Sequence, residues 1–383
     1  ENGVGAIHTE TGELLWQFNP GEGPVIPEGT DGNEILARDR DGTVYAIDTD
    51  TGDPTAEIPV GQGYGLGYNG TGQWFAPVSE GRVVSGEVGS PNIIWDTAVE
   101  GVPFRPAVTG DNSRVLVSTV TAPPSSLNLD DPESVDAEGR LYALDATDGS
   151  VLWESSRVGA GFGTPAIQNG QVYWAGGDGD ILTYNVETGE GVWEFKTSGS
   201  FPRSPAVTSN VVLAGNRDGY LYGVDVDTGE QIGRLPAGAP ISTNPVVVAD
   251  VVYLGTDAGS VYAFEYGGEG RLWEFDAGAS VRSLAPGNDR VVVGTETGYY
   301  VLSGDESSAG GSAASTTQRA DGGGGGNEAA TGGTGGDATG VRQRGLFSNG
   351  GEEPDAVSNP FNLTMLGFLL SVVGIVHQLF QGR

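Results

Sequence analysis

Short apolar runs separated by glycine-containing turns recur along the chain as far as residue 302. In the clearest stretch the runs lie at residues 204–207, 210–214, 220–225 and 231–235. Apolar residues are not spaced three and four positions apart, as an amphipathic helix would require. The pattern therefore predicts four successive strands of one sheet, with residues 204–207 as the innermost strand.

One motif returns at a nearly fixed interval and defines a repeat. It reads Asp-Gly-Thr-Val-Tyr-Ala-Ile-Asp at residues 41–48 and Glu-Gly-Arg-Leu-Tyr-Ala-Leu-Asp at residues 138–145. Its first glycine, or the residue in that place, is Asn2, Gly42, Gly81, Gly139, Gly179, Gly219, Gly259 and Gly298. Successive copies are 40, 39, 58, 40, 40, 40 and 39 residues apart. This period, with four short strands in each repeat, is typical of propeller blades, so we predict an all-β propeller of four-stranded blades.

A tryptophan follows the motif glycine by fourteen residues in five of the repeats. These residues are Trp16, Trp95, Trp153, Trp193 and Trp273. A large flat side chain at a fixed place on an outer strand buries much apolar area at one contact, so we expect each indole to pack at the seam between neighbouring blades. The alternative is that the indoles form platforms for a ligand.

The run Tyr-Ala-Leu-Asp-Ala-Thr-Asp-Gly-Ser-Val-Leu-Trp, at residues 142–153, resembles the repeat of the pyrroloquinoline-quinone-like (PQQ-like) β-propellers. That superfamily includes the quinoprotein alcohol dehydrogenases and the bacterial outer-membrane assembly lipoprotein. The resemblance covers residues 1–302 and is specific for the fold. For function it is weak, because propellers host enzymes, scaffolds and binding modules alike.

The repeats account for seven blades in this chain. The chain opens inside a repeat at Glu1, and the resemblance implies a ring of eight, so we expect eight blades in the complete ring. The alternative is a ring of seven, in which residues 14–18 complete the last blade beside an extra third strand at residues 299–302.

Acidic residues dominate the charged residues of the chain. Asp and Glu total 51 against 18 Lys and Arg, and the formal net charge is -33. Such a surface suits molar salt, where charge repulsion is screened. A halophilic archaeon is therefore the expected source, and nucleic acid is excluded as a partner because its phosphates would be repelled.

Few side chains are available for catalysis or metal binding. The chain has no cysteine, and its two histidines are His8 and His377. These counts exclude a thiolate site and a histidine metal cluster, and they disfavour a Ser-His-Asp triad. The Asp-rich stretches at residues 48–53 and 225–230 lack the distal Glu of a calcium-binding loop and coincide with a turn of the repeat. We predict no catalytic residue, no metal site and no cofactor.

Arg105, Arg203 and Arg282 stand just before the innermost strand in three repeats. Innermost strands line the channel of a propeller, so three guanidinium groups would crowd one rim of it and form an anion site for carboxylate or phosphate. In the alternative interpretation, these arginines pair with neighbouring acids across the blade seams.

The 58-residue step contains an insertion at roughly residues 121–136, which is acidic and rich in proline. A long loop on a rigid ring is a common place for a binding function. The alternative is a surface insertion that the fold tolerates.

The repeat ends at Leu302, and two further segments follow it. Residues 303–358 are rich in Gly, Ser, Thr and Ala and are predicted to form a flexible acidic linker. Residues 359–383 contain the uncharged stretch 361–380, which is long enough as a helix to cross a membrane. Acidic residues precede this stretch and Arg383 follows it, so we predict a single-pass anchor with the propeller outside the cell. An interfacial or protein-buried helix is the alternative.

Two functions stay open. The first is a non-catalytic, membrane-anchored scaffold or binding module at the cell surface, whose faces hold a protein or another surface component. The second is a membrane-bound quinoprotein dehydrogenase, for which the resemblance implies pyrroloquinoline quinone with calcium over the central channel. Some of those enzymes carry an adjacent cysteine pair there, which this chain lacks, and no stretch of the sequence matches a quinone site. The scaffold is therefore favoured.

Overall fold

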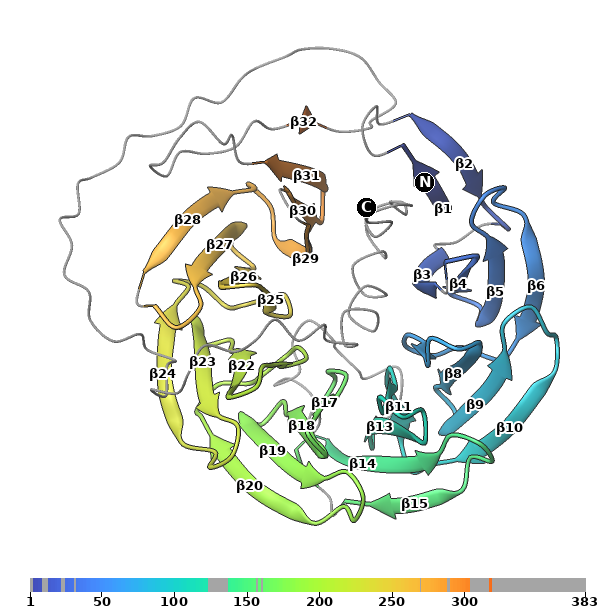
Figure 1. Ribbon diagram of the computed structural model, residues 1–383, viewed down its shortest axis with the longest axis horizontal. Helices are drawn as coiled ribbons and strands as arrows, with labels where there is room; N and C mark the ends of the chain where they lie inside the picture. The colour runs from blue at the N-terminus through green and yellow to red at the C-terminus, as the bar shows by residue number, and fades with distance from the viewer. Residues whose placement is uncertain are drawn as a thin grey trace.

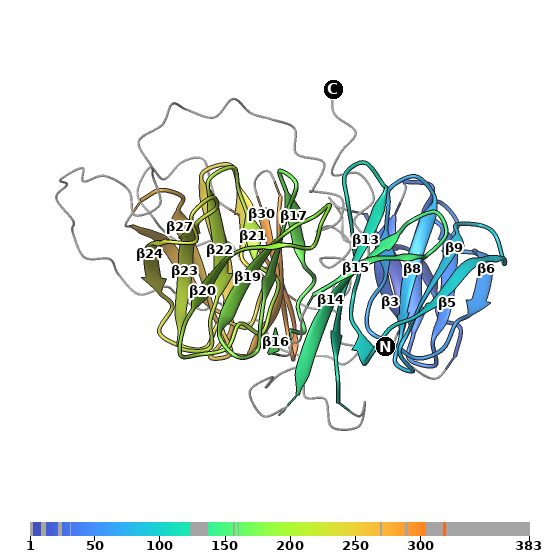
Figure 2. The ribbon, with the colours of Figure 1, turned by 90° about the horizontal axis from the view of Figure 1, so that it is seen from below.

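Seven β-sheets stand as blades around a central channel in the computed structural model (Figure 1). The structure describes residues 3–8, 13–21, 25–30, 32–122, 137–155, 158–159, 161–268, 270–287, 290–303 and 317–318. Within these ranges every regular element is a β-strand, which confirms the predicted all-β propeller with seven blades. Seen from the side, the strands run between the two faces of the ring (Figure 2).

Blades 1 to 3 contain the strands from β3 to β16. Blade 1 consists of β3 (Val25–Thr30), β4 (Glu34–Asp39), β5 (Thr43–Asp48) and β6 (Pro54–Pro59). Blade 2 consists of β7 (Gly67–Tyr68), β8 (Gln73–Val78), β9 (Arg82–Glu87) and β10 (Ile93–Ala98). Blade 3 consists of β11 (Val102–Pro103), β12 (Ala107–Val108), β13 (Arg114–Val120), β14 (Glu138–Asp145), β15 (Val151–Glu154) and β16 (Val158–Gly159).

Blades 4 to 7 contain the strands from β17 to β32. Blade 4 consists of β17 (Ala166–Gln168), β18 (Gln171–Ala175), β19 (Asp180–Asn185) and β20 (Gly191–Lys196). Blade 5 consists of β21 (Ala206–Val207), β22 (Val211–Gly215), β23 (Tyr220–Asp225) and β24 (Gln231–Pro236). Blade 6 consists of β25 (Val246–Val248), β26 (Val251–Gly255), β27 (Ser260–Glu265) and β28 (Arg271–Asp276). Blade 7 consists of β29 (Val281–Pro286), β30 (Arg290–Thr295), β31 (Gly298–Ser303) and β32 (Thr317–Gln318).

The predicted strand order within a repeat is confirmed in blade 5. Its four strands follow the predicted ranges closely, and each pairs antiparallel with the next. The motif glycine lies in the turn between the second and third strands, where Gly219 has a φ of 85°. Glycine adopts this left-handed backbone without steric cost, which explains why it recurs. Gly139 differs because the insertion of blade 3 places it inside β14, opposite Val120.

A separate sheet of two strands lies beside blade 1. Its strands, β1 (Val4–Ile7) and β2 (Leu14–Phe18), pair with each other, and Val4 and Phe18 join the apolar cluster of blade 1. In blade 7, β31 pairs with β32, a strand inside the segment predicted as a linker. The alternative in which residues 14–18 complete the last blade is therefore wrong, because the edge of β31 is taken by β32 and β2 is held by β1.

The apolar core lies in layers between neighbouring blades. One cluster joins Leu213 and Leu221 of blade 5 to Val252 and Leu254 of blade 6, and all four side chains are inaccessible to solvent. Alternate side chains of a strand point to opposite faces of its sheet, and blades 1 to 6 each contribute to two such layers. Each of these blades therefore depends on its neighbours for the burial of its core.

The tryptophans of the outer strands contact a turn of the following blade. Trp193 of β20 donates a 3.0 Å hydrogen bond from Nε1 to the carbonyl of Val226, and its ring lies against Gly229. A Cβ at Gly229 would be 2.7 Å from that ring, and the φ there is 73°. Both the contact with the ring and the left-handed backbone therefore disfavour any side chain at this position. The same bond and the same glycine contact occur at Trp16, Trp95 and Trp153. Trp273 of β28 packs against the apolar cluster shared by blades 6 and 7.

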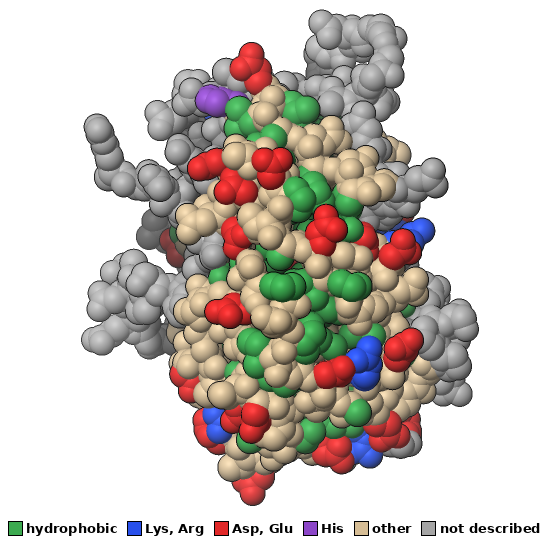
Figure 3. Space-filling model, turned by 90° about the vertical axis from the view of Figure 1, so that its right-hand side faces the viewer, with side chains coloured by type: hydrophobic (Ala, Val, Ile, Leu, Met, Phe, Trp, Pro, Cys, Tyr) green, Lys and Arg blue, Asp and Glu red, His purple; other side chains and the backbone are tan. Residues whose placement is uncertain are grey.

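Acidic side chains are scattered over the side of the ring seen in Figure 3, and basic ones are fewer there. Apolar side chains lie among them. In the β1–β2 sheet, blade 2 and blade 3, the two residues before the seam tryptophan are exposed and aliphatic. These residues are Leu14, Leu15, Ile93, Ile94, Val151 and Leu152. Exposed apolar side chains are thus present on the outer wall together with charged ones.

Two predicted segments fall largely outside the described residues. The insertion of blade 3 is described as far as Ala122 and again from Ala137, and β14 projects beyond the face of the ring on that side (Figure 2). The predicted membrane segment, residues 359–383, and nearly all of the predicted linker also lie outside. Among the residues that are described, no helix is long and apolar enough to cross a membrane.

Candidate functional site

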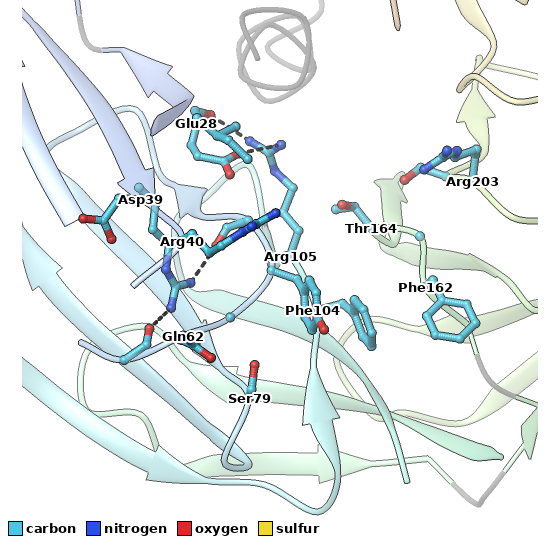
Figure 4. A pocket seen from close by; sticks show the side chains of 18 of the residues that line it. Glu28, Asp39, Arg40, Gln62, Ser79, Phe104, Arg105, Phe162, Thr164 and Arg203 are labelled. Atoms are coloured by element: carbon cyan, nitrogen blue, oxygen red, sulfur yellow. Dashed lines mark hydrogen bonds and ion pairs between the residues drawn. The ribbon is translucent and has the colours of Figure 1, made fainter. Parts of the chain in front are cut away.

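A groove of about 1100 Å³ opens at one end of the central channel (Figure 4). Its lining residues come from six consecutive blades, 1 to 6. Residues 38–41 belong to a turn between second and third strands, whereas residues 61–65, 162–164 and 202–204 lead into innermost strands. Both kinds of segment lie on the same face of a blade, so the fold brings them together. The groove follows the rim of the channel as an arc.

A buried ion pair joins blade 1 to blade 3 in the wall of this groove. Nη1 of Arg105 lies 3.1 Å from Oε2 of Glu28, and Nη2 donates a 2.7 Å bond to the Glu28 carbonyl. Arg38 lies beside this pair and donates bonds of 3.2 and 2.8 Å to the carbonyls of Gly65 and Pro77. Both arginines therefore bind protein acceptors and stabilise the wall of the groove.

Burial changes the ionisation of this wall network. Loss of solvent raises the pKa of Glu28, while the positive charges of Arg105 and Arg38 act in the opposite direction. Burial also lowers the pKa of Arg38 to about 10, against the attraction of Glu28. Charged groups are stable in such a place when they are paired and hydrogen-bonded, which holds for Arg105 and Glu28, whereas the buried Nε of Arg38 has no hydrogen-bond partner among the described residues.

Arg40 was missed by the sequence prediction. It lies in the turn between β4 and β5, is exposed, and points into the groove, whereas the neighbouring Asp39 points away (Figure 4). Arg40 makes no hydrogen bond or ion pair with any residue in the described ranges. One signal for it exists in the sequence, because arginine precedes the Asp-Gly of the motif in two repeats, at Arg40 and Arg217. Arg217 differs from Arg40 in lying 3.7 Å from Asp257 and outside the groove lining.

The three arginines predicted to share a rim have separate surroundings. Arg105 and Arg203 line the groove on opposite walls, and Arg282 is not part of its lining (Figure 4). Nε of Arg203 donates a 2.8 Å bond to the carbonyl of Ser242 across the seam between blades 5 and 6, which orients the guanidinium. Arg282 forms an ion pair with Glu296 of its own blade. The structure thus brings two of the three to one groove.

Three aromatic side chains form the wall between Arg105 and Arg203. Tyr64 stacks on Phe104 with ring centroids 5.0 Å apart, and Phe162 meets Phe104 edge-on at 5.2 Å. Phe104 is buried, whereas Tyr64 and Phe162 are partly exposed. Ala122 and Ala137, the described ends of the blade 3 insertion, pack against the same cluster. The aromatic wall therefore joins the groove to the foot of the insertion.

Acidic side chains also line the groove, and two of them are already bound by protein groups. Glu28 is held in the buried ion pair. Asp39 accepts a 2.8 Å bond from the backbone N–H of Thr43 and a 2.9 Å bond from the hydroxyl of Tyr45. The four carboxylates of the lining are Glu28, Asp39, Asp41 and Glu80.

These carboxylates do not fit the calcium ion that, by the superfamily resemblance, accompanies the quinone. Calcium takes six to eight oxygen ligands, with carboxylates prominent among them. Asp41 and Glu80 are the groove carboxylates left once Glu28 and Asp39 are bound, and Glu80 lies 3.7 Å from Arg82. No group of three or more His, Cys, Asp or Glu side chains in the described part of the chain is placed to hold a metal ion. We therefore derive no chemical step through such a cofactor.

The repeat, the ring of blades and the groove at the channel mouth define a PQQ-like β-propeller. The chain matches the family described as outer membrane protein assembly factor BamB over residues 1–65 and 70–309, and it belongs to that family. The resemblance found in the repeat is thereby confirmed at the level of the family.

Two solved structures share the fold. The crystal structure of BamB from Moraxella catarrhalis is 17% identical, the match covers 76% of this chain and 88% of that one, and the TM-score is 0.58. The computationally designed Ika8 protein is 16% identical, with 79% and 90% covered and a TM-score of 0.68. A comparison with curated proteins gives no match. At these identities the likeness concerns the fold alone.

Proposed function

We propose that this chain is a non-catalytic scaffold or binding module and that it holds its partner in the groove at the channel mouth. The observation that carries the proposal is the set of cations in the groove. Arg40 and Arg203 face the cavity in a chain whose formal net charge is -33. Membership of a family described as an assembly factor supports a role in holding other proteins. The interlocked blades supply the rigid frame that a preorganised site needs.

In this proposal the propeller lies at the outer surface of a halophilic archaeal cell. Residues 361–380 anchor it in the membrane, and residues 303–358 tether it, so that a protein or another surface component can reach the groove. The uncharged stretch and the acidic composition support this arrangement. Removal of residues 359–383 is expected to shift the protein from the membrane fraction to the soluble fraction. An intact chain that already fractionates as soluble would contradict the anchor.

Site-directed photo-cross-linking in intact cells tests the binding role. A photoreactive residue at Thr164, inside the groove, is expected to form an adduct with a partner. The matched control carries the same residue at Leu152 on the outer wall, where the side chain is 43% exposed. Adducts from position 152 alone would place the interaction on the outer wall and would contradict the groove as the binding site.

Calorimetric titration with pyrroloquinoline quinone and calcium in molar salt tests the dehydrogenase alternative. We expect no stoichiometric binding, because the groove carboxylates are poorly placed for the ion. Binding at micromolar affinity would contradict the scaffold proposal and support a quinoprotein dehydrogenase. The next step would then be a search for an alcohol or sugar substrate.

A further inference from the structure

Basic side chains are enriched in the groove relative to the rest of the chain. Four of the 18 basic residues line it, against four of the 51 acidic residues, Glu28, Asp39, Asp41 and Glu80. Arg38 and Arg105 are turned to carbonyls and to Glu28, so they strengthen the wall. Arg40 has no partner among the described residues, and Arg203 is oriented by its bond to Ser242. The charge offered to a ligand therefore comes from Arg40 and Arg203, on opposite sides of the aromatic wall (Figure 4).

The shape of the groove favours an extended ligand. Its lining runs through six blades, and its volume of about 1100 Å³ lies above the range that encloses a compact small molecule. The backbone of residues 61–65 is largely bonded within the protein, because the N–H of Gly61 donates to the Gly42 carbonyl and the carbonyls of Gly61, Gln62 and Gly65 accept bonds from Arg38 and Ser79. The exposed side chain of Gln62 adds a hydrogen-bond donor and an acceptor there. The main chain of an extended ligand can pair with this side-chain amide.

The aromatic wall adds an apolar contact between the two cations. Tyr64 and Phe162 are partly exposed on either side of the buried Phe104. A ring or an aliphatic side chain that packs on them is removed from water, while a carboxylate on either side reaches Arg40 or Arg203. Both contacts are satisfied together by a short peptide in which apolar residues alternate with acidic ones.

From these features we infer that the groove binds an extended acidic peptide segment of a partner protein, with carboxylates at Arg40 and Arg203 and an apolar side chain on the aromatic wall. The inference rests on the proposed binding function and specifies its ligand. It does not require the blade 3 insertion or the tail.

Fluorescence anisotropy with a labelled synthetic peptide tests this inference on the full-length chain in detergent micelles and 0.5 M KCl. The probe is Asp-Phe-Glu-Phe-Asp with blocked ends, and its neutral counterpart is Asn-Phe-Gln-Phe-Asn. We expect the acidic peptide to bind at least about tenfold more tightly, since a charge-assisted hydrogen bond contributes roughly a factor of ten. Arg40→Gln and Arg203→Gln are each expected to weaken that binding about tenfold.

Two matched controls lie outside the groove. Arg217 occupies the same turn position as Arg40 but pairs with Asp257, and Arg282 occupies the same place as Arg203 but pairs with Glu296. Arg217→Gln and Arg282→Gln are expected to leave the affinity within about twofold. Because Arg40 is exposed and makes no described contact, its replacement does not threaten folding.

The inference is overturned if the neutral peptide binds as well as the acidic one, or if the control variants weaken binding as much as Arg40→Gln. It is also overturned if free phenylacetate competes as strongly as the peptide, since a compact anion would then suffice. If the peptides fail while Thr164 still forms adducts with a partner in cells, the proposed function stands and the ligand class is wrong. If no peptide binds and Thr164 forms no adduct, both the proposed function and the proposed ligand are wrong.

Discussion

The outer seams and the inner rim of this propeller use the repeat in opposite ways. At the seams, four tryptophans make the same hydrogen bond to a backbone carbonyl and the same contact with a turn glycine. At the rim, three arginines at one repeat position have three different partners, namely Glu28, Ser242 and Glu296. Contacts that recur at several seams hold the ring together, whereas a position whose surroundings change from blade to blade is free to acquire a function.

The largest expected effect comes from breaking a seam. Trp95 is 7% exposed, packs on Gly149 and donates a 2.9 Å bond to the carbonyl of Ala146. Trp95→Ala is expected to lower the free energy of unfolding by about 3–5 kcal/mol, because it leaves a cavity between two blades. Urea unfolding followed by tryptophan fluorescence and circular dichroism measures this loss.

The neighbouring Ile94 supplies the control for that variant. It lies on the same strand but is 49% exposed, so Ile94→Ala is expected to change stability by less than about 0.5 kcal/mol. Equal losses in the two variants would mean that the tryptophan does not hold the seam.

A smaller loss is expected from the wall of the groove. Arg105→Ala leaves the carboxylate of Glu28 buried without its main partner, and breaking a buried pair in this way costs about 3 kcal/mol. Arg38 stays close enough to limit the damage. Arg282→Ala removes an ion pair at the surface and is expected to cost less than about 1 kcal/mol. If both variants unfold at the same urea concentration, the buried pair of Arg105 and Glu28 stabilises the fold no more than the surface pair of Arg282 and Glu296.

The second partner in a seam contact is the turn glycine, such as Gly229 beside Trp193. Gly229→Ala forces a Cβ to within 2.7 Å of the Trp193 ring at a φ of 73°, so we expect a loss of about 2 kcal/mol. Gly191, on β20, has open space at its Cβ position, and Gly191→Ala is expected to leave stability unchanged or slightly increased. A melting temperature unchanged by Gly229→Ala would show that the turn moves away from the indole at little cost.

The smallest effect concerns a turn that belongs to neither region. The Thr109 hydroxyl, followed by the backbone and side chain of Ser113, binds the carboxylate of Asp111 and lowers its pKa to about 2. A depressed pKa stabilises the fold above the ordinary value of 3.8, and this contribution disappears as the pH falls from there to about 2. Asp111→Asn should therefore lose less than about 1 kcal/mol at pH 7, since the group is largely solvated. The difference from the parent should shrink as the pH falls from 3.8 and vanish only at about pH 2, and a constant difference would assign it to another cause.

Much of the fold was predictable from the sequence because a propeller repeats its local rules. The motif glycine and the tryptophan fourteen residues after it recur at fixed places, and the strands of blade 5 follow the predicted ranges. The last blade was less predictable. The pairing of β32 with β31 joins residues that are separated by a segment with no repeat pattern, so nothing local indicated it.

The groove was predictable only in part. The place of Arg105 and Arg203 before innermost strands indicated the channel rim, and both line the groove. The buried partner of Arg105 is a glutamate two blades away, and acidic residues are so common in this chain that no pattern distinguishes Glu28. Arg40 was not predicted, because it lies in a turn between second and third strands, and only in the folded ring do such turns reach the same rim as the starts of innermost strands.

Hydrogen–deuterium exchange on the full-length chain, with and without the acidic peptide, tests the central claim most directly. The account predicts slower exchange in residues 61–65, 162–164 and 202–204 when the peptide is present, and no change in β10, β15 or β20. Protection confined to those outer strands, or binding without protection of the three groove segments, would contradict the assignment of the channel mouth as the binding site.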